Sequence, residues 1–160
     1  RIDVGALIEP IVAVRRARAQ PDSPRIAFAR PRADTANIMG EKSRLVRVIE
    51  NLLDNAISFS PTHGLVTIGA TCAGEAIIIR IEDEGPGVPP HQREEIFRRF
   101  HSIRPPDEEY GKHSGLGLAI ARSIIEAHDG VITALDRDNA MSGACFEVRL
   151  PVAGERSDEK

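Results

Sequence analysis

Asn51, Asn55 and Ser58 are spaced so that, on a helix, their side chains would form one polar row. Positions i, i+4 and i+7 share a helical face, and this row runs beside an apolar stripe. Neutral amide oxygens suit Mg²⁺, a hard cation that keeps several waters and shares its other positions with phosphates. Asparagine is a poor helix former, which favours use of both amides by a group outside the helix. The alternative is that they bond local backbone or face water.

A second candidate is the segment of residues 83–88, Asp-Glu-Gly-Pro-Gly-Val, which joins a carboxylate to two glycines. Asp83 continues the inward alternation of the isoleucines in residues 77–81. A carboxylate on the core side needs hydrogen-bond donors, and the amino group of an adenine would supply them. Gly85 and Gly87 would let the backbone approach a flat base and adopt dihedrals that other residues avoid. The alternative is a plain turn.

A third candidate is the segment of residues 111–118, Gly-Lys-His-Ser-Gly-Leu-Gly-Leu, which begins a predicted helix. Unpaired amides at a helix start, together with glycines that permit close approach, form an anion site suited to a triphosphate. The alternative is a flexible loop that ends in a helix cap. The segment is neither a dinucleotide-binding fingerprint, since no strand directly precedes it, nor a Walker loop, since the Gly-Lys-Ser/Thr ending is missing.

Hydrophobic periodicity predicts the elements that would hold these segments together. The clearest helix spans residues 42–60, because its apolar residues share one face and a proline follows. Two alternating runs predict a hairpin over residues 66–81, and another helix covers 116–128, with Gly130 as its left-handed cap. The inward positions of the first hairpin strand are Val66, Ile68, Ala70 and Cys72. A first helix has apolar residues at Leu7, Ile8, Ile11, Val12 and Val14. Short strands are expected at 2–4, 26–29, 36–39, 131–135 and 144–150.

The long segment between Asp83 and Gly115 is rich in glycine, proline and charge. Its apolar residues are Ile96, Phe97 and Phe100. A loop of this length without regular structure is usually functional, and we expect a lid over a ligand.

The composition of the 160-residue chain excludes several classes of ligand. A formal net charge of −3 gives no positive footprint for DNA or RNA. Cys72 and Cys145 lie in unlike contexts, which supports neither a zinc site nor a disulfide framework. The longest apolar run, residues 76–79, is far short of a bilayer span, so we expect a soluble fragment. The lack of a starting methionine indicates an excised piece. We expect one domain over residues 1–153 and a polar, disordered tail over 154–160.

Four motifs occur in order along the chain, and together they are far more specific than any one of them. They are Asn51-Leu52-Leu53-Asp54-Asn55-Ala56, Asp83-x-Gly-x-Gly, Ile96-Phe97-Arg98-Arg99-Phe100 and Gly115-Leu116-Gly117-Leu118. In this order they resemble the N, G1, F and G2 boxes of sensor histidine kinases. The resemblance covers nearly the whole chain. It implies the Bergerat fold, an α/β (α+β) two-layer sandwich in which a mixed sheet packs on helices and an ATP lid covers the nucleotide.

The resemblance also implies a role for each matching position, with ATP and Mg²⁺ as cofactors. Asn51 and Asn55 would serve Mg²⁺ and the phosphates, with Asn55 the first choice for direct metal contact. Phe59 would pack on the adenine, and Asp83 would bind its amino group. The other nucleotide-binding positions would be Ser58, Gly85, Gly87, Val88, Lys112, His113, Ser114, Gly115, Leu116 and Gly117. The lid anchors would be Phe97 and Phe100.

Departures from the family pattern concern the phosphate end of the site. Ser58 stands where the family often has a basic residue, and His113-Ser114 replaces a more usual Gly-Thr. An arginine that often follows the F box is missing, which leaves Arg104 or Lys112 as substitutes. The pattern of residues 57–61 with His113-Ser114-Gly115 most resembles the envelope- and acid-responsive kinases of alphaproteobacteria.

Two other functions use the same fold. ATPases of the gyrase, chaperone and mismatch-repair type activate water with a glutamate four residues before the metal-binding asparagine, and here that position is Asn51, which is no base. A module that binds nucleotide without transferring phosphate is the second alternative. The F box favours the kinase.

In the kinase interpretation the γ-phosphoryl group goes to a histidine on a separate dimerisation domain of the same kinase. None of the five histidines has the surroundings of a phosphoacceptor, so we expect the chain to bind ATP without phosphorylating itself. They are His63, His91, His101, His113 and His128. A response regulator would be an indirect partner, and we expect no contact with nucleic acid or membrane. The predicted location is the cytoplasmic portion of an inner-membrane kinase.

Overall fold

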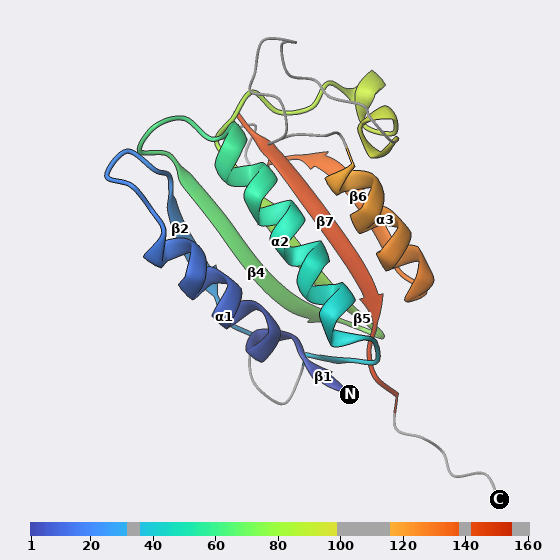
Figure 1. Ribbon diagram of the computed structural model, residues 1–160. Coiled ribbons are helices and arrows are strands. Elements are labelled where there is room, and N and C mark those ends of the chain that lie inside the picture. Colours follow the sequence, from blue (N-terminus) through green and yellow to red (C-terminus); the bar gives the residue numbers. More distant parts are fainter. Residues whose placement is uncertain (32–35, 99–115, 138–141, 155–160) are drawn as a thin grey trace, which may run out of the picture.

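The computed structural model describes residues 1–31, 36–98, 116–137 and 142–154 (Figure 1). The helices are α1 (Val4–Ala17), α2 (Lys42–Phe59) and α3 (Gly117–Ala127). The strands are β1 (Ile2–Asp3), β2 (Arg25–Ala29), β3 (Asn37–Ile38), β4 (Leu65–Ala73), β5 (Ala76–Glu82), β6 (Val131–Asp136) and β7 (Ala144–Pro151). Two short 3₁₀ turns, η1 (Pro90–Gln92) and η2 (Glu95–Phe97), follow β5. The predictions for residues 99–115 and 155–160 concern positions outside the described residues.

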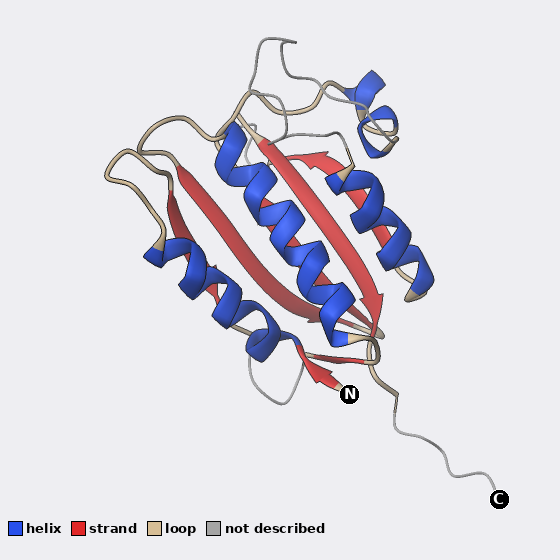
Figure 2. Cartoon of the chain, viewed as in Figure 1, coloured by secondary structure: helices blue, strands red, loops and turns tan. Residues whose placement is uncertain are grey.

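Five strands form one mixed sheet in the order β2-β4-β5-β7-β6, and β1 pairs with β3. β2 and β4 are parallel, whereas the other neighbours in the large sheet are antiparallel. Figures 1 and 2 show the three helices on one face of this sheet, with α2 between α1 and α3. The arrangement confirms the predicted two-layer α/β sandwich, in which each helix buries its apolar stripe against the sheet.

The core lies between α2 and the central strands. Ile77, Ile79 and Ile81 of β5 are at most 2% exposed, as their alternation predicted. The buried face of α2 consists of Leu45, Val48, Ile49, Leu52, Leu53 and Ala56. Burial of one such aliphatic side chain stabilises by about 1.5–3 kcal/mol, so packing rather than helix propensity holds α2 in place. None of the helices in the described ranges is long and apolar enough to cross a bilayer.

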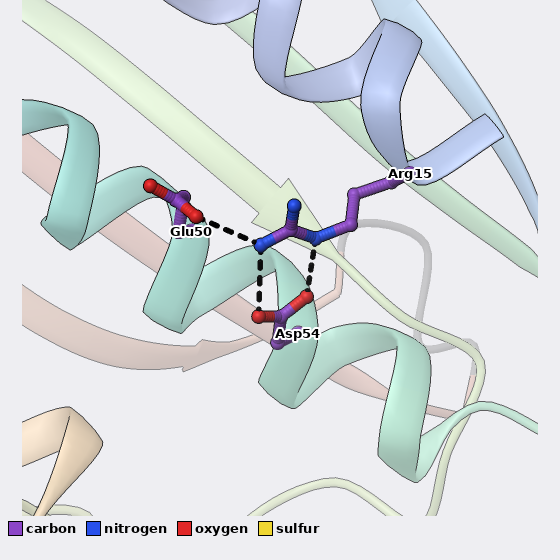
Figure 3. A network of polar contacts seen from close by, with 3 residues as sticks. All are labelled: Arg15, Glu50 and Asp54. Carbon is purple, nitrogen blue, oxygen red and sulfur yellow. Dashed lines mark hydrogen bonds and ion pairs between the residues drawn. The ribbon is translucent and has the colours of Figure 1, made fainter. Parts of the chain in front are cut away.

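Arg15 occupies the position on α1 where the buried stripe would continue after Ile8 and Ile11. Its guanidinium bonds both carboxylate oxygens of Asp54 on α2, at 2.6 and 3.0 Å, and also Glu50, at 3.0 Å (Figure 3). The two carboxylates raise the pKa of Arg15, which is only 14% exposed. A bidentate ion pair of this kind fixes the orientation of α1 against α2.

The structure corrects three expectations about local positions. Val14 is 41% exposed, because the covered face of α1 passes through Arg15 instead. Cys72 is exposed near the end of β4, beyond the part of that strand that the helices cover. The left-handed residue after α3 is Asp129, at φ 59°, and not Gly130.

Gly130 has a different reason to be a glycine. A Cβ at this position would lie 2.5 Å from the carbonyl oxygen of Arg149. Its backbone N–H donates to the carbonyl oxygen of Ile125, which completes the end of α3. The short side chain of Asp129 tolerates the left-handed conformation, and Gly130 then allows the chain to enter β6 against β7.

Candidate functional site

The candidate segments meet at one end of the sandwich. In Figure 1 the C-terminal end of α2, the loop after β5 and the start of α3 all lie near that end. Asn51, on α2, donates a hydrogen bond from its side-chain amide to the carbonyl oxygen of Gly117, at 3.1 Å. The N-box and G2-box segments are therefore in direct contact, although 66 positions separate them in the sequence.

Asp83, directly after β5, is the one buried charged side chain among the described residues, at 2% exposure. Its Oδ1 atom accepts hydrogen bonds from the backbone N–H groups of Gly85, at 2.8 Å, and Ala144, at 3.3 Å. Burial raises the pKa of Asp83, while these two bonds and the charge of Arg137 act in the opposite direction. The inward position that the alternation predicted for Asp83 is confirmed.

The two glycines after Asp83 differ from each other. Gly87 has a φ of +78°, in the left-handed region, as predicted. Gly85 has no such dihedral, but a Cβ there would lie 2.5 Å from the carbonyl oxygen of Phe59 at the end of α2. Gly85 thus lets this loop pack on the chain's own backbone. Val88, the next predicted site residue, is buried.

The predicted polar row lies on α2. Asn51 and Asn55 are half-buried, Phe59 is half-buried at the last position of the helix, and Ser58 is exposed. Because the amide nitrogen of Asn51 is engaged by Gly117, its side-chain oxygen can face a different partner. The amide oxygens on this half of α2 are therefore suited to a hard cation or a polar ligand.

Only the end of the predicted phosphate segment falls within the described residues. Leu116 precedes the first turn of α3, and its carbonyl oxygen accepts from Ile120, at 2.9 Å. Gly117 begins α3, and a Cβ there would lie 3.8 Å from Cγ of Asn51. The other predicted contacts are outside the described part of the chain: Lys112, His113, Ser114 and Gly115.

The base of the predicted lid packs on α3 and β7. Phe97 is buried and meets the ring of Phe146 edge to face, with ring centroids 6.1 Å apart. The Arg122 guanidinium lies 5.4 Å from the centroid of the Phe97 ring and pairs with Glu94 and Glu126, both at 3.0 Å. The position of Phe97 agrees with its predicted role as an anchor, and Phe100 lies outside the described residues.

Sequence reasoning missed a second set of residues against the Asp83 loop. The Ser142 hydroxyl donates to the carbonyl oxygen of Gly85, at 2.9 Å, and Arg137 donates to the carbonyl oxygen of Ser142, also at 2.9 Å. Gly143 has a φ of +131°, where a side chain is strained. The Ser-Gly pair directly before the last strand was the one available signal.

The fold and these contacts define a two-layer α/β sandwich with a buried carboxylate at one end of the sheet. Residues 40–154 match the model of the histidine kinase-, DNA gyrase B- and HSP90-like ATPases, and the chain belongs to this family. The predicted resemblance to histidine kinase catalytic domains is thereby confirmed.

Individual relatives agree with this assignment. The chain is 37% identical to sensor protein ChvG of Rhizobium meliloti over 134 residues, which are 81% of this chain and 22% of that protein. The mycobacterial sensor histidine kinase MprB is 30% identical with a TM-score of 0.75, covering 94% of this chain and 95% of that one. Full-length ShkA in complex with AMPPNP is 25% identical with a TM-score of 0.78, covering 96% and 31%. The chain thus spans about a fifth of the length of its curated relative ChvG.

Proposed function

We propose that this domain binds Mg-ATP between α2, the Asp83 loop and the start of α3, and presents the γ-phosphate to a histidine on a dimerisation domain of the same kinase. The buried carboxylate of Asp83 carries this proposal. A buried acceptor anchored on backbone N–H groups suits the amino group of adenine. ShkA, which has the same fold, was solved with the ATP analogue AMPPNP.

The other residues take their roles from their places around Asp83. Phe59, whose backbone packs on Gly85, would contact the base together with Gly87 and Val88. The free amides at the start of α3 would meet the phosphates, from Leu116 and Gly117 with the preceding residues Lys112, His113, Ser114 and Gly115. Ser58, exposed on α2, would contribute at the phosphate end.

The donor set on the C-terminal half of α2 fits Mg²⁺. Asn51 and Asn55 offer neutral amide oxygens, and the bond from Asn51 to Gly117 holds one of these side chains next to the phosphate segment. A bound Mg²⁺ would neutralise charge on the phosphate oxygens. The chain's own residues hold the nucleotide and exclude water, and they supply no covalent chemistry.

Hydrolysis is the competing function of this fold, and one contact disfavours it. In the hydrolytic relatives a glutamate would stand at position 51 as the base. Here Asn51 is neutral and its amide nitrogen is committed to Gly117. A neutral amide cannot remove a proton from water. We therefore favour transfer to a protein histidine over ATP hydrolysis.

The boundaries and surroundings of the domain belong to the same proposal. Ala153 is buried and donates to the carbonyl oxygen of Asn37, at 2.8 Å, which supports a domain over residues 1–153. We propose that it works in the cytoplasm as part of a membrane-bound sensor kinase, with a response regulator as an indirect partner.

Calorimetric titration with Mg-ADP tests the binding step. The wild-type chain should bind, and Asp83→Asn should lose about ten- to a hundredfold in affinity, the value of a hydrogen bond to a charged acceptor. Asp22→Asn, an exposed position in the α1–β2 turn, is the matched control and should bind like wild type. No heat of binding with correctly folded wild-type protein contradicts the proposal.

The transfer step needs a second measurement. The chain is mixed with labelled ATP and a separately produced dimerisation domain, and phosphohistidine is measured on that domain. Label that appears only as free phosphate indicates an ATPase. Binding without either product indicates a module that holds nucleotide only.

A further inference from the structure

The residues that flank the β6–β7 connection lie against the loop that carries Asp83. We call Arg137, Ser142 and Gly143 the hairpin clamp. None of the proposed nucleotide contacts involves these three residues. Each of them nevertheless contacts the 83–87 loop or a residue that packs on this loop. Their contacts are to backbone, so they act on the shape of the loop.

Two members of the clamp fix the loop directly. The Ser142 hydroxyl donates to the carbonyl oxygen of Gly85, at 2.9 Å. Gly143 packs so closely that a Cβ there would overlap the carbonyl oxygen of Asp83. A Cβ on Gly87 would also lie 2.9 Å from the carbonyl oxygen of Gly143. The backbone on both sides of Asp83 is therefore held from the β7 side.

Arg137 adds a charge to this packing. Its Nη1 atom donates to the carbonyl oxygen of Ser142, at 2.9 Å, and a Cβ on Gly143 would lie 2.6 Å from its Cδ atom. Its Nε–H is buried and has no hydrogen-bond partner within the described part of the chain. A buried donor left without an acceptor is destabilising, and a role in the site would account for it.

Charged groups on the neighbouring elements are committed elsewhere. Glu84 accepts from the backbone N–H of Leu65, and Glu82 from the hydroxyl of Thr67. Asp136, on β6, pairs with Arg93, and Asp54, on α2, pairs with Arg15. Arg137 is the charged side chain, among the described residues, that lowers the pKa of Asp83 against the effect of burial.

We propose that Arg137 is a positioning residue for purine selection, which with Ser142 fixes the 83–87 loop and holds Asp83 as a hydrogen-bond acceptor for a 6-amino purine. The inference rests on the proposed function, because it requires that Asp83 faces the base. An ionised carboxylate only accepts hydrogen bonds, so it matches the amino group of adenine and opposes the 6-oxo group of hypoxanthine. A protonated carboxyl group can donate, and that discrimination is then lost.

The sign of the pH dependence follows from this chemistry. Asp83 is ionised above its pKa, and removal of the Arg137 charge raises that pKa further. As the pH falls, a variant without this charge should lose its preference for adenine at a higher pH than wild type does. A purely structural role of Arg137 would weaken both nucleotides equally and would not move this transition.

The test compares Mg-ADP with Mg-IDP, titrated into the full chain over a pH series from neutral to acid. Arg137→Met keeps an unbranched apolar stem and removes the charge, and Arg137→Lys keeps the charge. We expect Arg137→Met to weaken ADP about tenfold at neutral pH, the range of one charge-assisted hydrogen bond, and to leave IDP nearly unchanged. Arg137→Lys should keep most of the preference, and Arg18→Met, an exposed position after α1, is the control.

Three results separate the possibilities. An equal ADP-to-IDP ratio and an equal acid midpoint in wild type and Arg137→Met overturn the inference while Mg-ADP binding still stands. If Arg137→Met does not fold, Arg137→Lys takes its place, and a folded Arg137→Lys that loses the preference for ADP over IDP overturns the inference. A wild-type preference for ADP that stays constant down to the pH of acid unfolding also overturns it. Failure of the wild-type chain to bind ADP removes the proposed function, and the inference falls with it.

Discussion

The side-chain amide nitrogen of Asn51 lies 3.1 Å from the carbonyl oxygen of Gly117 and donates a hydrogen bond to it. This bond joins the middle of α2 to the first residue of α3. The start of α3 has no side-chain cap of its own. The Asn51 bond goes to a carbonyl oxygen, so it does not cap the free N–H groups but ties the first residue of α3 to α2. One asparagine can thus serve the fold and stand beside the proposed phosphate site.

Asn51→Ala should therefore loosen the start of α3. We expect a loss of about 1 kcal/mol in unfolding free energy, the net value of one hydrogen bond. Hydrogen exchange should accelerate at the amides of Ile120 and Ala121, in the first turns of α3. Ser43→Ala, at the exposed opposite end of α2, is the control. Unchanged exchange at these amides would show that the bond does not order the helix start.

Asp83→Asn should weaken nucleotide binding without lowering the stability of the fold. Burial raises the pKa of Asp83, so its ionised form is less favourable in the folded chain than in the unfolded one. The stability that this raised pKa contributes is complete at acid pH and is lost as the pH rises through the folded pKa. Asparagine keeps an acceptor for the Gly85 and Ala144 amides without the charge. We expect equal or higher thermal stability at neutral pH, together with weaker Mg-ADP binding.

The direction of this pH dependence is checked by measuring the stability of wild type and Asp83→Asn over a pH series. The stability advantage of Asp83→Asn over wild type should shrink as the pH falls, because wild-type Asp83 then becomes neutral as well. Thermal unfolding followed by circular dichroism measures it. An advantage that grows toward acid pH would contradict the argument.

Sequence periodicity was sufficient for the elements that bury one regular face. The stripe of α2 with its closing proline, and the alternation of β5, gave the correct places for Asn51, Asn55 and Asp83. Both patterns are local, since each is read within one helix or strand. The mixed sheet itself followed only from the family resemblance.

Contacts between distant segments were beyond the same reasoning. Arg15 stands in an apolar stripe and reads as a surface charge until Asp54 is placed opposite it. The contacts of Ser142 and Gly143 can be predicted only when β7 is known to lie beside the Asp83 loop. Gly130 was expected to be a left-handed cap, but its reason is the neighbouring carbonyl of Arg149.

The pair of Arg15 and Asp54 should contribute measurably to stability. The Arg15 side chain is mostly covered and contacts both oxygens of Asp54, although Asp54 itself is 56% exposed. We expect Arg15→Met to lower the unfolding free energy by about 0.5–1 kcal/mol, since solvent at Asp54 screens the pair. A double-mutant cycle with Asp54→Asn measures the coupling, and Arg18→Met is the exposed control. Additive effects would show that the pair does not hold α1 on α2.

Gly143→Ala should be among the most damaging single substitutions in the chain. A Cβ there overlaps the Asp83 carbonyl, and the φ of +131° is strained for alanine. The backbone must shift, so we expect a loss above about 2 kcal/mol in unfolding free energy. Gly69→Ala is the matched control, because its nearest neighbour would be 3.4 Å away in β2. Equal melting temperatures for the two variants would contradict the packing described for Gly143.

Arg122→Met tests the base of the predicted lid. The guanidinium lies over the ring of Phe97 and pairs with Glu94, so it ties η2 and the turn before it to α3. Because these contacts are partly exposed, stability should fall by no more than about 1 kcal/mol. The larger effect should be local. Proteolysis in the 90–98 region should become faster, whereas Arg47→Met, an exposed position on α2, should leave the cleavage rate unchanged. If Arg122→Met cleaves as slowly as the control, the anchoring of the lid base rests on the buried pair of Phe97 and Phe146 alone.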